Sequence, residues 1–169
     1  MRTRQIIRVV VILAILISNV SCDQISKNIV RQTIEYNEQI GFVHDYLTLT
    51  KVENTGAFLS LGNELPNALR IILLIALPVL VMTYGLFFLF TKTNMSKSML
   101  VGISFVLGGG IGNMYDRIIH GSVTDFLHID FVIFQTGIFN MADVSIMTGM
   151  FLILIRPFYK EMNDKLRSL

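Results

Sequence analysis

Long apolar runs separated by polar segments dominate this chain. Four runs consist almost entirely of apolar residues, at positions 6–21, 71–90, 99–114 and 139–155. A helix needs about 20 such residues to cross the hydrocarbon core of a bilayer. The pattern therefore predicts a membrane α-helical protein, a bundle of four transmembrane helices at about residues 6–22, 69–90, 98–116 and 139–156.

Signals for β-structure lie in the polar segments between these runs. Residues 41–52 partly alternate between apolar and polar side chains, as a half-buried strand does. Asn54 to Gly56 then predicts a turn, and residues 57–61 predict a second strand. An amphipathic piece over 25–36 is expected to link the first helix to the sheet.

The second polar region, residues 117–138, is rich in β-formers and is expected to add strands. Together, residues of about 37–66 and 118–138 predict a small extracytoplasmic sheet that lies on the membrane surface. The whole chain, residues 1–169, is expected to be one integral membrane domain.

Composition and charge strengthen the membrane assignment. Hydrophobic residues make up 53% of the chain, and the mean hydropathy is +0.62, well above the values of soluble domains.

Nine Lys and Arg residues flank one side of the predicted spans and five lie on the other. The positive-inside rule then predicts a multi-pass protein with both termini in the cytoplasm. No basic stripe with interleaved aromatics is present, so nucleic acid is excluded as a partner.

Cys22 is the only cysteine in the sequence, which excludes an internal disulfide and a multi-cysteine metal site. With the preceding basic and apolar residues it is also similar to a bacterial lipoprotein signal. Asn19 fits that signal poorly, because an aliphatic residue is expected three positions before the cysteine. We therefore expect the first helix to be retained, and whether Cys22 is modified stays open.

Two aspartates, Asp125 and Asp143, are the strongest candidates for chemistry. Each lies beside the last apolar run, where an ionised carboxylate is costly and is seldom placed for packing. We expect each to be the other's partner. Asn140 lies three residues before Asp143 on the same helix face, and the sequence is equally consistent with a simple helix cap.

Further polar residues have a structural alternative as well. Asp23 and Lys27 are four residues apart on one helix, which predicts an ion pair at the membrane interface. A nucleophilic pair of Ser26 with Lys27 is conceivable, although adjacent helical residues face different directions. Asn113 and Arg117 also share a face, and the arginine fits either an interface anchor or a group that orients the acids.

The glycines at 108–110 and 112 do not have the spacing of a dinucleotide loop and predict close helix packing instead. His44, His120 and His128 lack the spacing of metal ligands. We therefore expect no metal and no cofactor.

Five short motifs in this order resemble the bacterial lipoprotein signal peptidases, or signal peptidase II. They are Asp23-Gln-Ile-Ser-Lys27, Asn54-Thr-Gly-Ala57, Gly108-Gly-Gly-Ile-Gly-Asn-Met-Tyr-Asp-Arg117, Val123-Thr-Asp-Phe126 and Phe139-Asn-Met-Ala-Asp143. The resemblance implies an aspartic endopeptidase of the inner membrane, with its active site at the outer face. It would cleave signal peptides just before a diacylglyceryl-modified cysteine.

The resemblance also implies roles for individual residues. Asp125 and Asp143 match the catalytic pair, and Gly56 matches the glycine that lets an external loop fold over the site. The matching polar shell consists of Asp23, Lys27, Asn54, Asn113, Arg117 and Asn140. Phe58 and Leu59 depart from the family pattern, because the aromatic residue comes one position early; the loop's contacts and motion are therefore not assigned.

The implied partners are a lipidated prolipoprotein substrate, membrane lipids and inhibitory peptide antibiotics of the globomycin type, and we expect a monomer. In the expected mechanism two close carboxylates share one proton, and one of them activates water. Sequence alone does not say which aspartate holds the proton, nor the signal-sequence preference. Two other classes remain open from the residues alone: a small transporter or ion relay that uses the same acids, and a non-catalytic lipid-binding or assembly protein.

Overall fold

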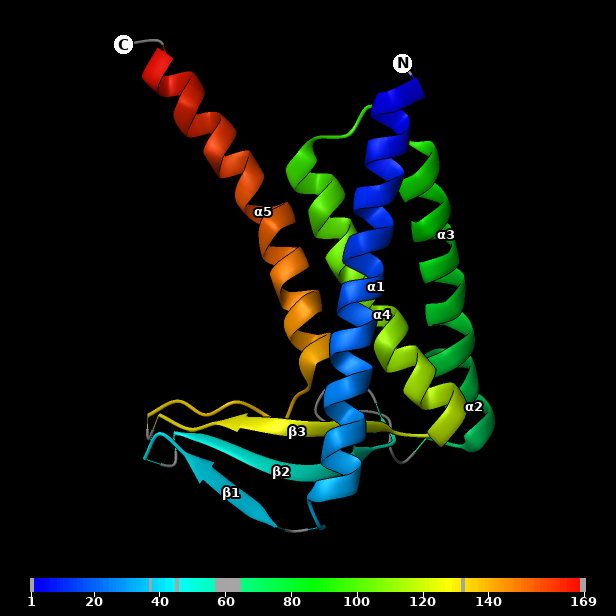
Figure 1. The fold of residues 1–169 in the computed structure, drawn as a ribbon, viewed down its shortest axis with the longest axis vertical. Helices are drawn as coiled ribbons and strands as arrows, with labels where there is room; N and C mark the ends of the chain where they lie inside the picture. Colours follow the sequence, from blue (N-terminus) through cyan, green and yellow to red (C-terminus); the bar gives the residue numbers. More distant parts are fainter. Residues whose placement is uncertain (1, 37, 45, 57–64, 132, 168–169) are drawn as a thin grey trace.

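In the computed structural model, a group of long helices stands on a small sheet (Figure 1). The structure describes residues 2–36, 38–44, 46–56, 65–131 and 133–167, without the side chains of 2 and 156–167. The elements, in chain order, are α1 (Arg2–Thr33), β1 (Gln39–Phe42), β2 (Leu47–Asn54), α2 (Asn67–Ile71), η2 (Ile72–Ala76), α3 (Leu77–Thr91), α4 (Lys97–His120), β3 (Val123–Ile129) and α5 (Met141–Arg167).

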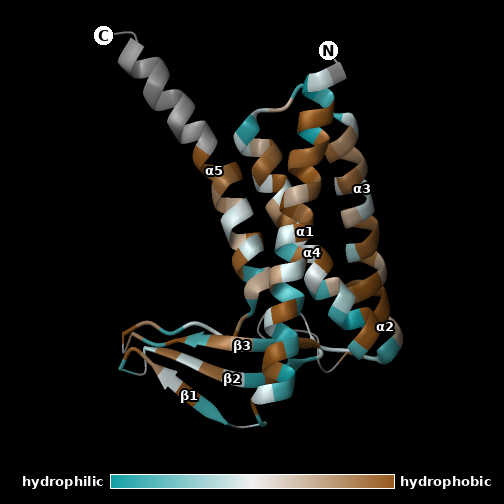
Figure 2. Ribbon diagram, in the orientation of Figure 1, coloured by the Kyte–Doolittle hydropathy of each residue, from teal (hydrophilic) through white to brown (hydrophobic). Residues whose placement is uncertain are grey.

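Among the described residues, three helical segments are long and apolar enough to cross a membrane: Thr3–Thr33, Asn67–Thr91 and Lys97–His120. The apolar part of α5, Met141–Ile155, is shorter. The helices are hydrophobic along most of their length (brown in Figure 2), whereas hydrophilic residues (teal) gather near the sheet. The predicted helical membrane class is thus confirmed.

Helix α1 is continuous for 32 residues and reaches the sheet without a break. The amphipathic link expected over 25–36 is therefore the last part of the same helix, down to Thr33. Near its start, α1 packs against α3 and α4 through a buried cluster that includes Ile12, Leu89 and Leu107. Near its end, Val30 and Ile34 pack against Phe126 of the sheet. One helix thus ties the apolar bundle to the polar layer.

The second apolar segment contains a proline that a regular helix would not accommodate. Pro78 lacks a backbone N–H, and its ring would clash with the carbonyl four residues earlier. The five residues of η2 directly before α3 form a wider π-helical turn. The chain therefore stays helical from Asn67 to Thr91.

Glycines allow α4 and α5 to pack closely, as their spacing predicts. A Cβ atom at Gly109 would collide with the backbone oxygen of Ala142, and one at Gly102 would collide with that of Gly149. Backbones approach this closely only where side chains are absent. The start of α5 is therefore held directly against α4.

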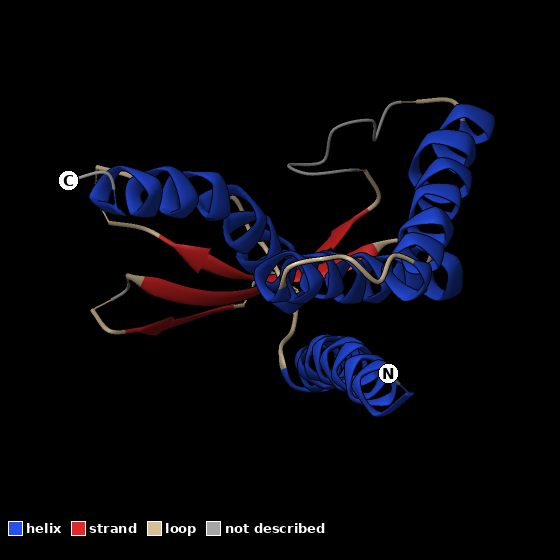
Figure 3. Ribbon diagram, turned by 90° about the horizontal axis from the view of Figure 1, so that it is seen from above, coloured by secondary structure: helices blue, strands red, loops and turns tan. Residues whose placement is uncertain are grey.

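In the part of the chain that the structure describes, three antiparallel strands form the sheet in the order β1-β2-β3. The prediction of a single strand over residues 41–52 is wrong, because the chain turns between β1 and β2. Val43 and His44 adopt positive φ angles of 52° and 56° in that turn, a conformation that alternation of side chains does not reveal. The strand predicted at 57–61 lies outside the described residues, and the strand expected within 117–138 is β3. Figure 3 shows the sheet extending sideways beneath the helices.

Candidate active site

The two candidate aspartates come from different elements that the backbone holds together. Asp125 is on β3, and Asp143 is in the first turn of α5. Leu127 and Phe139 form an antiparallel bridge, in which the Phe139 N–H donates to the Leu127 oxygen at 2.8 Å and the Leu127 N–H donates back at 2.8 Å. This bridge places the residue after Phe139, Asn140, beside Asp125.

Asn140 connects the two aspartates. Its Nδ2 donates to Oδ1 of Asp125 at 2.6 Å. Its Oδ1 accepts from the backbone N–H of Asp143 at 3.0 Å, and its own N–H donates to Oδ2 of Asp143 at 3.1 Å. The last two bonds form the reciprocal arrangement of a helix capping box. The helix-cap interpretation is thus correct, and the same side chain also bonds the other carboxylate.

A second asparagine reaches Asp125 from the end of β2. Asn54 Nδ2 donates to Oδ2 of Asp125 at 3.0 Å, and its Oδ1 accepts from the N–H of Gly56 at 3.0 Å. The second bond closes the turn predicted at 54–56. The Gly56 oxygen accepts from Nη2 of Arg117 at 2.8 Å. Residues Phe58 and Leu59, which depart from the family pattern, lie outside the described residues.

Asn113 on α4 donates to Asp143, as Asn54 donates to Asp125. Its Nδ2 donates to Oδ1 of Asp143 at 2.9 Å. Its Oδ1 accepts from Nζ of Lys27 at 2.8 Å and from Nδ2 of Asn140 at 3.1 Å. Lys27, Asn113 and Asn140 therefore form one continuous chain of hydrogen bonds that ends on both aspartates.

Groups that can only donate determine how all three amides are oriented. An ammonium or a backbone N–H carries no acceptor, so the amide atom that faces it must be the oxygen. That donor is Lys27 for Asn113, the Asp143 N–H for Asn140 and the Gly56 N–H for Asn54. Each Nδ2 is consequently turned toward an aspartate. With the N–H of Asn140, four donors of the described residues contact the two carboxylates.

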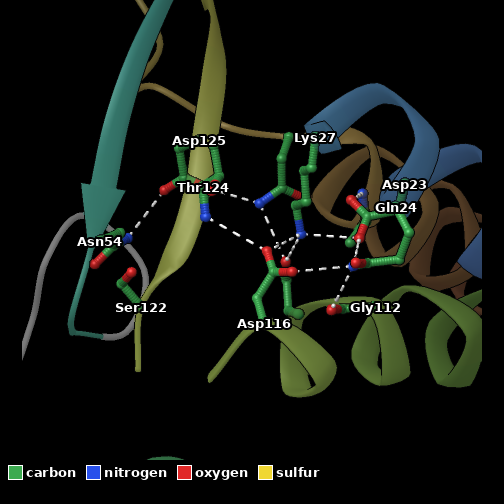
Figure 4. Close-up of polar contacts among 12 residues, drawn as sticks. Asp23, Gln24, Lys27, Asn54, Gly112, Asp116, Ser122, Thr124 and Asp125 are labelled. Carbon is green, nitrogen blue, oxygen red and sulfur yellow. Dashed lines mark hydrogen bonds and ion pairs between the residues drawn. The ribbon is translucent and has the colours of Figure 1, made fainter. Parts of the chain in front are cut away.

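The ion pair predicted between Asp23 and Lys27 is confirmed, but both side chains are buried, so the lysine does not extend to the surface. Lys27 Nζ lies 2.8 Å from Asp23 and 3.0 Å from Asp116, and all three side chains have 0% relative exposure. Two carboxylates hold the ammonium inside the protein (Figure 4). Breaking such a buried pair by removing one partner costs about 3–5 kcal/mol.

Asp23 also fixes the start of α5. Its Oδ1 accepts from the backbone N–H of Ala142 at 2.9 Å, one of the otherwise unpaired donors in the first helical turn. Gly112 leaves the room for this carboxylate, since a Cβ atom there would press on Asp23. Helix α1 thereby helps to place the turn that carries Asp143.

The sequence interpretation missed three members of this network, Asp116, Arg31 and Gln24. Arg31 lies 3.0 Å from Asp116 and donates from Nε to Oγ1 of Thr124 at 2.8 Å. Gln24 donates to Asp23, to Asp116 and to the Gly112 oxygen. Asp23, Lys27 and Arg31 follow each other at intervals of four on α1, and this stripe was the available signal.

The environments of the two aspartates differ. Asp125 is 5% exposed, whereas Asp143 is of intermediate exposure. Burial raises the pKa of Asp125 to about 6, and the negative charge of Asp143 acts in the same direction. The amide donors of Asn54 and Asn140, and the charge of Lys27, oppose this rise. Arg117 brings a positive charge near both carboxylates.

Other candidate residues do not join this centre. Ser26 donates its hydroxyl proton to the Asp23 backbone oxygen at 2.8 Å, and no bond between its hydroxyl and Lys27 is present among the described residues. Within the same part of the chain, no three His, Cys, Asp or Glu side chains are grouped to hold a metal ion. Cys22 is exposed on α1.

Solved structures with the same architecture are membrane enzymes. One, described as a bacterial membrane enzyme solved at 2.3 Å resolution, is similar with a TM-score of 0.78 and 25% identity, over 92% of this chain and 91% of that chain. A second, described likewise and solved at 1.9 Å, has a TM-score of 0.75 and 25% identity, over 86% of this chain and 91% of that one. Apolar helices with a polar carboxylate centre at one end thus define the class, which is that of membrane-embedded enzymes.

Sequence relatives identify the family. Residues 11–159 match the model of the signal peptidase II (SPase II) family. The lipoprotein signal peptidase of Streptococcus pneumoniae is 32% identical, over 96% of this chain and 99% of the relative. That of Enterococcus faecalis is 37% identical over 80% of each chain. The chain belongs to the signal peptidase II family of lipoprotein signal peptidases, which are aspartic peptidases that remove signal peptides from prolipoproteins. The transporter alternative finds no support in these relationships.

Proposed function

We propose that Asp125 and Asp143 are the catalytic pair with which this peptidase cleaves just before the lipidated cysteine. The observation that carries this proposal is the bonding of Asn140 to both carboxylates at once. Asn54 and Asn113 supply the remaining side-chain donors. Asp23 and Lys27 hold these groups in place, and Arg117 with Gly56 joins the turn after β2 to the centre.

In the proposed mechanism, Asp125 holds the proton and Asp143 acts as the base. The buried carboxyl of Asp125, with its raised pKa, keeps its proton more readily and so has one to donate, whereas Asp143 in the first turn of α5 is the more exposed of the two. Water attacks the scissile carbonyl carbon while Asp143 accepts a proton from it, and the Asp125 proton moves to the carbonyl oxygen. Collapse of this intermediate breaks the C–N bond: one hydroxyl proton returns to Asp125 as the new carboxyl group forms, and the amine of the cysteine leaves with the proton from Asp143.

The proposed placement in the membrane uses α5 as the fourth span. Its apolar residues Met141–Ile155 continue into a helix that ends at Arg167, so the whole element is long enough to cross. Both termini then lie in the cytoplasm, and the sheet lies on the outer membrane surface beside the site.

The chain acts as a single domain and a monomer in the inner membrane. Lipids cover the exposed apolar side chains of the helices, and globomycin-type antibiotics compete for the carboxylate centre.

Asparagine substitutions test the catalytic pair. Asp125→Asn and Asp143→Asn are each expected to abolish cleavage of a purified lipidated precursor, because an amide can neither share the proton nor accept one from water. The protein should remain at normal levels in the membrane, since the amide keeps the size of the carboxyl group. Ser26→Ala is the control and should keep wild-type activity. Full activity of either asparagine variant would refute the pair.

A further inference from the structure

A cavity with a cationic wall lies at the end of the helices opposite the sheet. It has a volume of about 760 Å³ and is bounded by the start of α1, the connection between α3 and α4, and the start of α4. That volume falls within the range of about 300–1,000 Å³ of small-molecule sites. The N-terminal end of α1 is far from the sheet that carries Asp125 (Figure 1), so the cavity is separate from the candidate active site.

The lining combines charge with aliphatic surface. Arg4, Arg8 and Lys97 supply three cations. The aliphatic part of the lining comes from both helices: Ile7, Val11, Leu100 and Val101. A free anion would satisfy the cations and leave the aliphatic part uncovered.

These cations have no nearby acids in the sequence. Residues 2–22 and 92–110 contain five Lys and Arg residues but no Asp or Glu. None of the ion pairs among the described side chains involves Arg4, Arg8 or Lys97. No acidic side chain in these two segments therefore balances the positive charge at the cavity.

Arg8 bonds two backbone oxygens through Nη2, and its Nε is left without an acceptor among the described residues. Its Nη2 donates to the backbone oxygens of Leu89 and Lys92, which ties α1 to the end of α3. Its Nε is buried and has no acceptor among the described residues. An anionic oxygen in the cavity would supply one after a small rotation of the side chain.

We propose that this cavity binds an anionic phospholipid, with the phosphate against Arg4 and Lys97 and an acyl chain along the aliphatic lining. Basic pockets between helices at the cytoplasmic membrane face have the chemistry for such headgroups. A zwitterionic lipid fits less well, because its own cation would face the cations of the wall. This lipid would take no part in the peptidase reaction. It would fill the cavity between α1 and α4.

Lipid retention by the purified full-length protein tests the site. Native mass spectrometry would compare phosphatidylglycerol with phosphatidylcholine of the same acyl chains. The wild type should retain phosphatidylglycerol preferentially, and the double variant R4Q/K97Q should retain about thirtyfold less, since each of the two basic residues near a membrane surface contributes about 1 kcal/mol. Arg8 is left unchanged because it bonds α3.

The double variant K51Q/R70Q removes the same charge outside the cavity and is the matched control. It should retain phosphatidylglycerol like the wild type, and all variants should cleave a lipidated peptide in detergent at wild-type rates. Equal retention of both lipids, equal losses in the two double variants, or displacement of the lipid by inorganic phosphate alone would each overturn the proposal.

Discussion

At the scale of single residues, the site depends on amide groups whose direction is determined. Asn54, Asn113 and Asn140 each present an oxygen to a group that only donates, and each turns its nitrogen toward a carboxylate. Lys27 therefore acts on Asp143 without touching it, by orienting Asn113. A substitution that keeps size and changes donors is the sharpest way to test such a centre.

Asn113→Asp makes that change. The new carboxylate still accepts from Lys27, so the fold should be retained, but the like charge beside Asp143 lowers the free energy of unfolding. The donor to Asp143 is lost and a like charge replaces it, so kcat should fall by about 10²–10³-fold, as when one preorganised donor is removed. Steady-state cleavage and thermal unfolding in detergent measure the two effects.

Asn67→Asp is the matched control, because Asn67 also accepts from a cation, Arg70, at 2.8 Å but lies outside the site. It should leave kcat unchanged. Near-normal kcat in Asn113→Asp would show that the orientation of this amide does not matter.

Asn54→Ala tests the titration of Asp125. The amide donor of Asn54 lowers the pKa of Asp125 and so opposes the effect of burial. Without it the charged form is less stable, and the pKa should rise above about 6. If Asp125 must be protonated, activity falls as the pH rises through this pKa, and the falling limb of the kcat/KM profile should move to higher pH by about one unit.

Asn28→Ala removes an exposed amide from α1 and should leave the profile unchanged. A limb that stays in place in Asn54→Ala, or moves to lower pH, contradicts the assignment of the proton to Asp125.

At the scale of elements, close packing of α4 on α5 determines how the two aspartates meet. Gly109 faces the backbone of α5, which cannot move aside without shifting the turn that carries Asp143. Gly109→Ala should therefore destabilise the protein by about 1–3 kcal/mol, the usual cost of overpacking. It should lower the midpoint of thermal unfolding and reduce kcat at the same time.

The neighbouring Gly110→Ala is its control. A Cβ atom there would meet the sulfur of Met82, the flexible end of a side chain on α3, at 2.9 Å. Because Met82 can rotate away, this variant should keep most of its activity and stability. Equal effects of the two substitutions would mean that the α4–α5 contact is not the critical one.

The elements also show what the sequence could and could not predict. The long apolar runs located the helices well, because a helix that crosses a bilayer needs about 20 apolar residues and so leaves a strong signal. It did not locate the turn at Val43 and His44, since positive φ angles at such residues are rare and have no compositional signature.

For the site, i to i+4 spacing and family motifs identified the residues that the structure brings together around Asp125 and Asp143. Asp116 was missed because its partners, Lys27 and Arg31, come from a helix more than 80 positions earlier in the chain. The burial of Lys27 was missed for the same reason: only tertiary contacts supply its two carboxylates.

At the scale of the whole molecule, the proposed topology places the two ends of the bundle on opposite sides of the membrane. Single cysteines in a Cys22→Ser background test it. Gln135→Cys, in the segment after β3, should react in intact spheroplasts with a thiol reagent that cannot cross membranes. Asn94→Cys, between α3 and α4, should react only after permeabilisation.

Both positions are exposed, so differences in access within the protein should be small. Labelling of Asn94→Cys in intact spheroplasts would contradict cytoplasmic termini. Because the residues of the lipid cavity and those of the carboxylate centre lie at opposite ends, the same result also decides which leaflet each one meets.

The helix cap at Asn140 has a consequence for how the enzyme responds to heat. The hydrogen bonds of Asn140 at the start of α5 also align Asp125 with Asp143. If this single helical turn opens, the two carboxylates lose their alignment and activity is lost while the rest of the fold is intact. Ends of helices open more readily than their centres. Inactivation should therefore precede melting, and the upper limit of the working temperature should depend on the first turn of one helix rather than on the stability of the bundle.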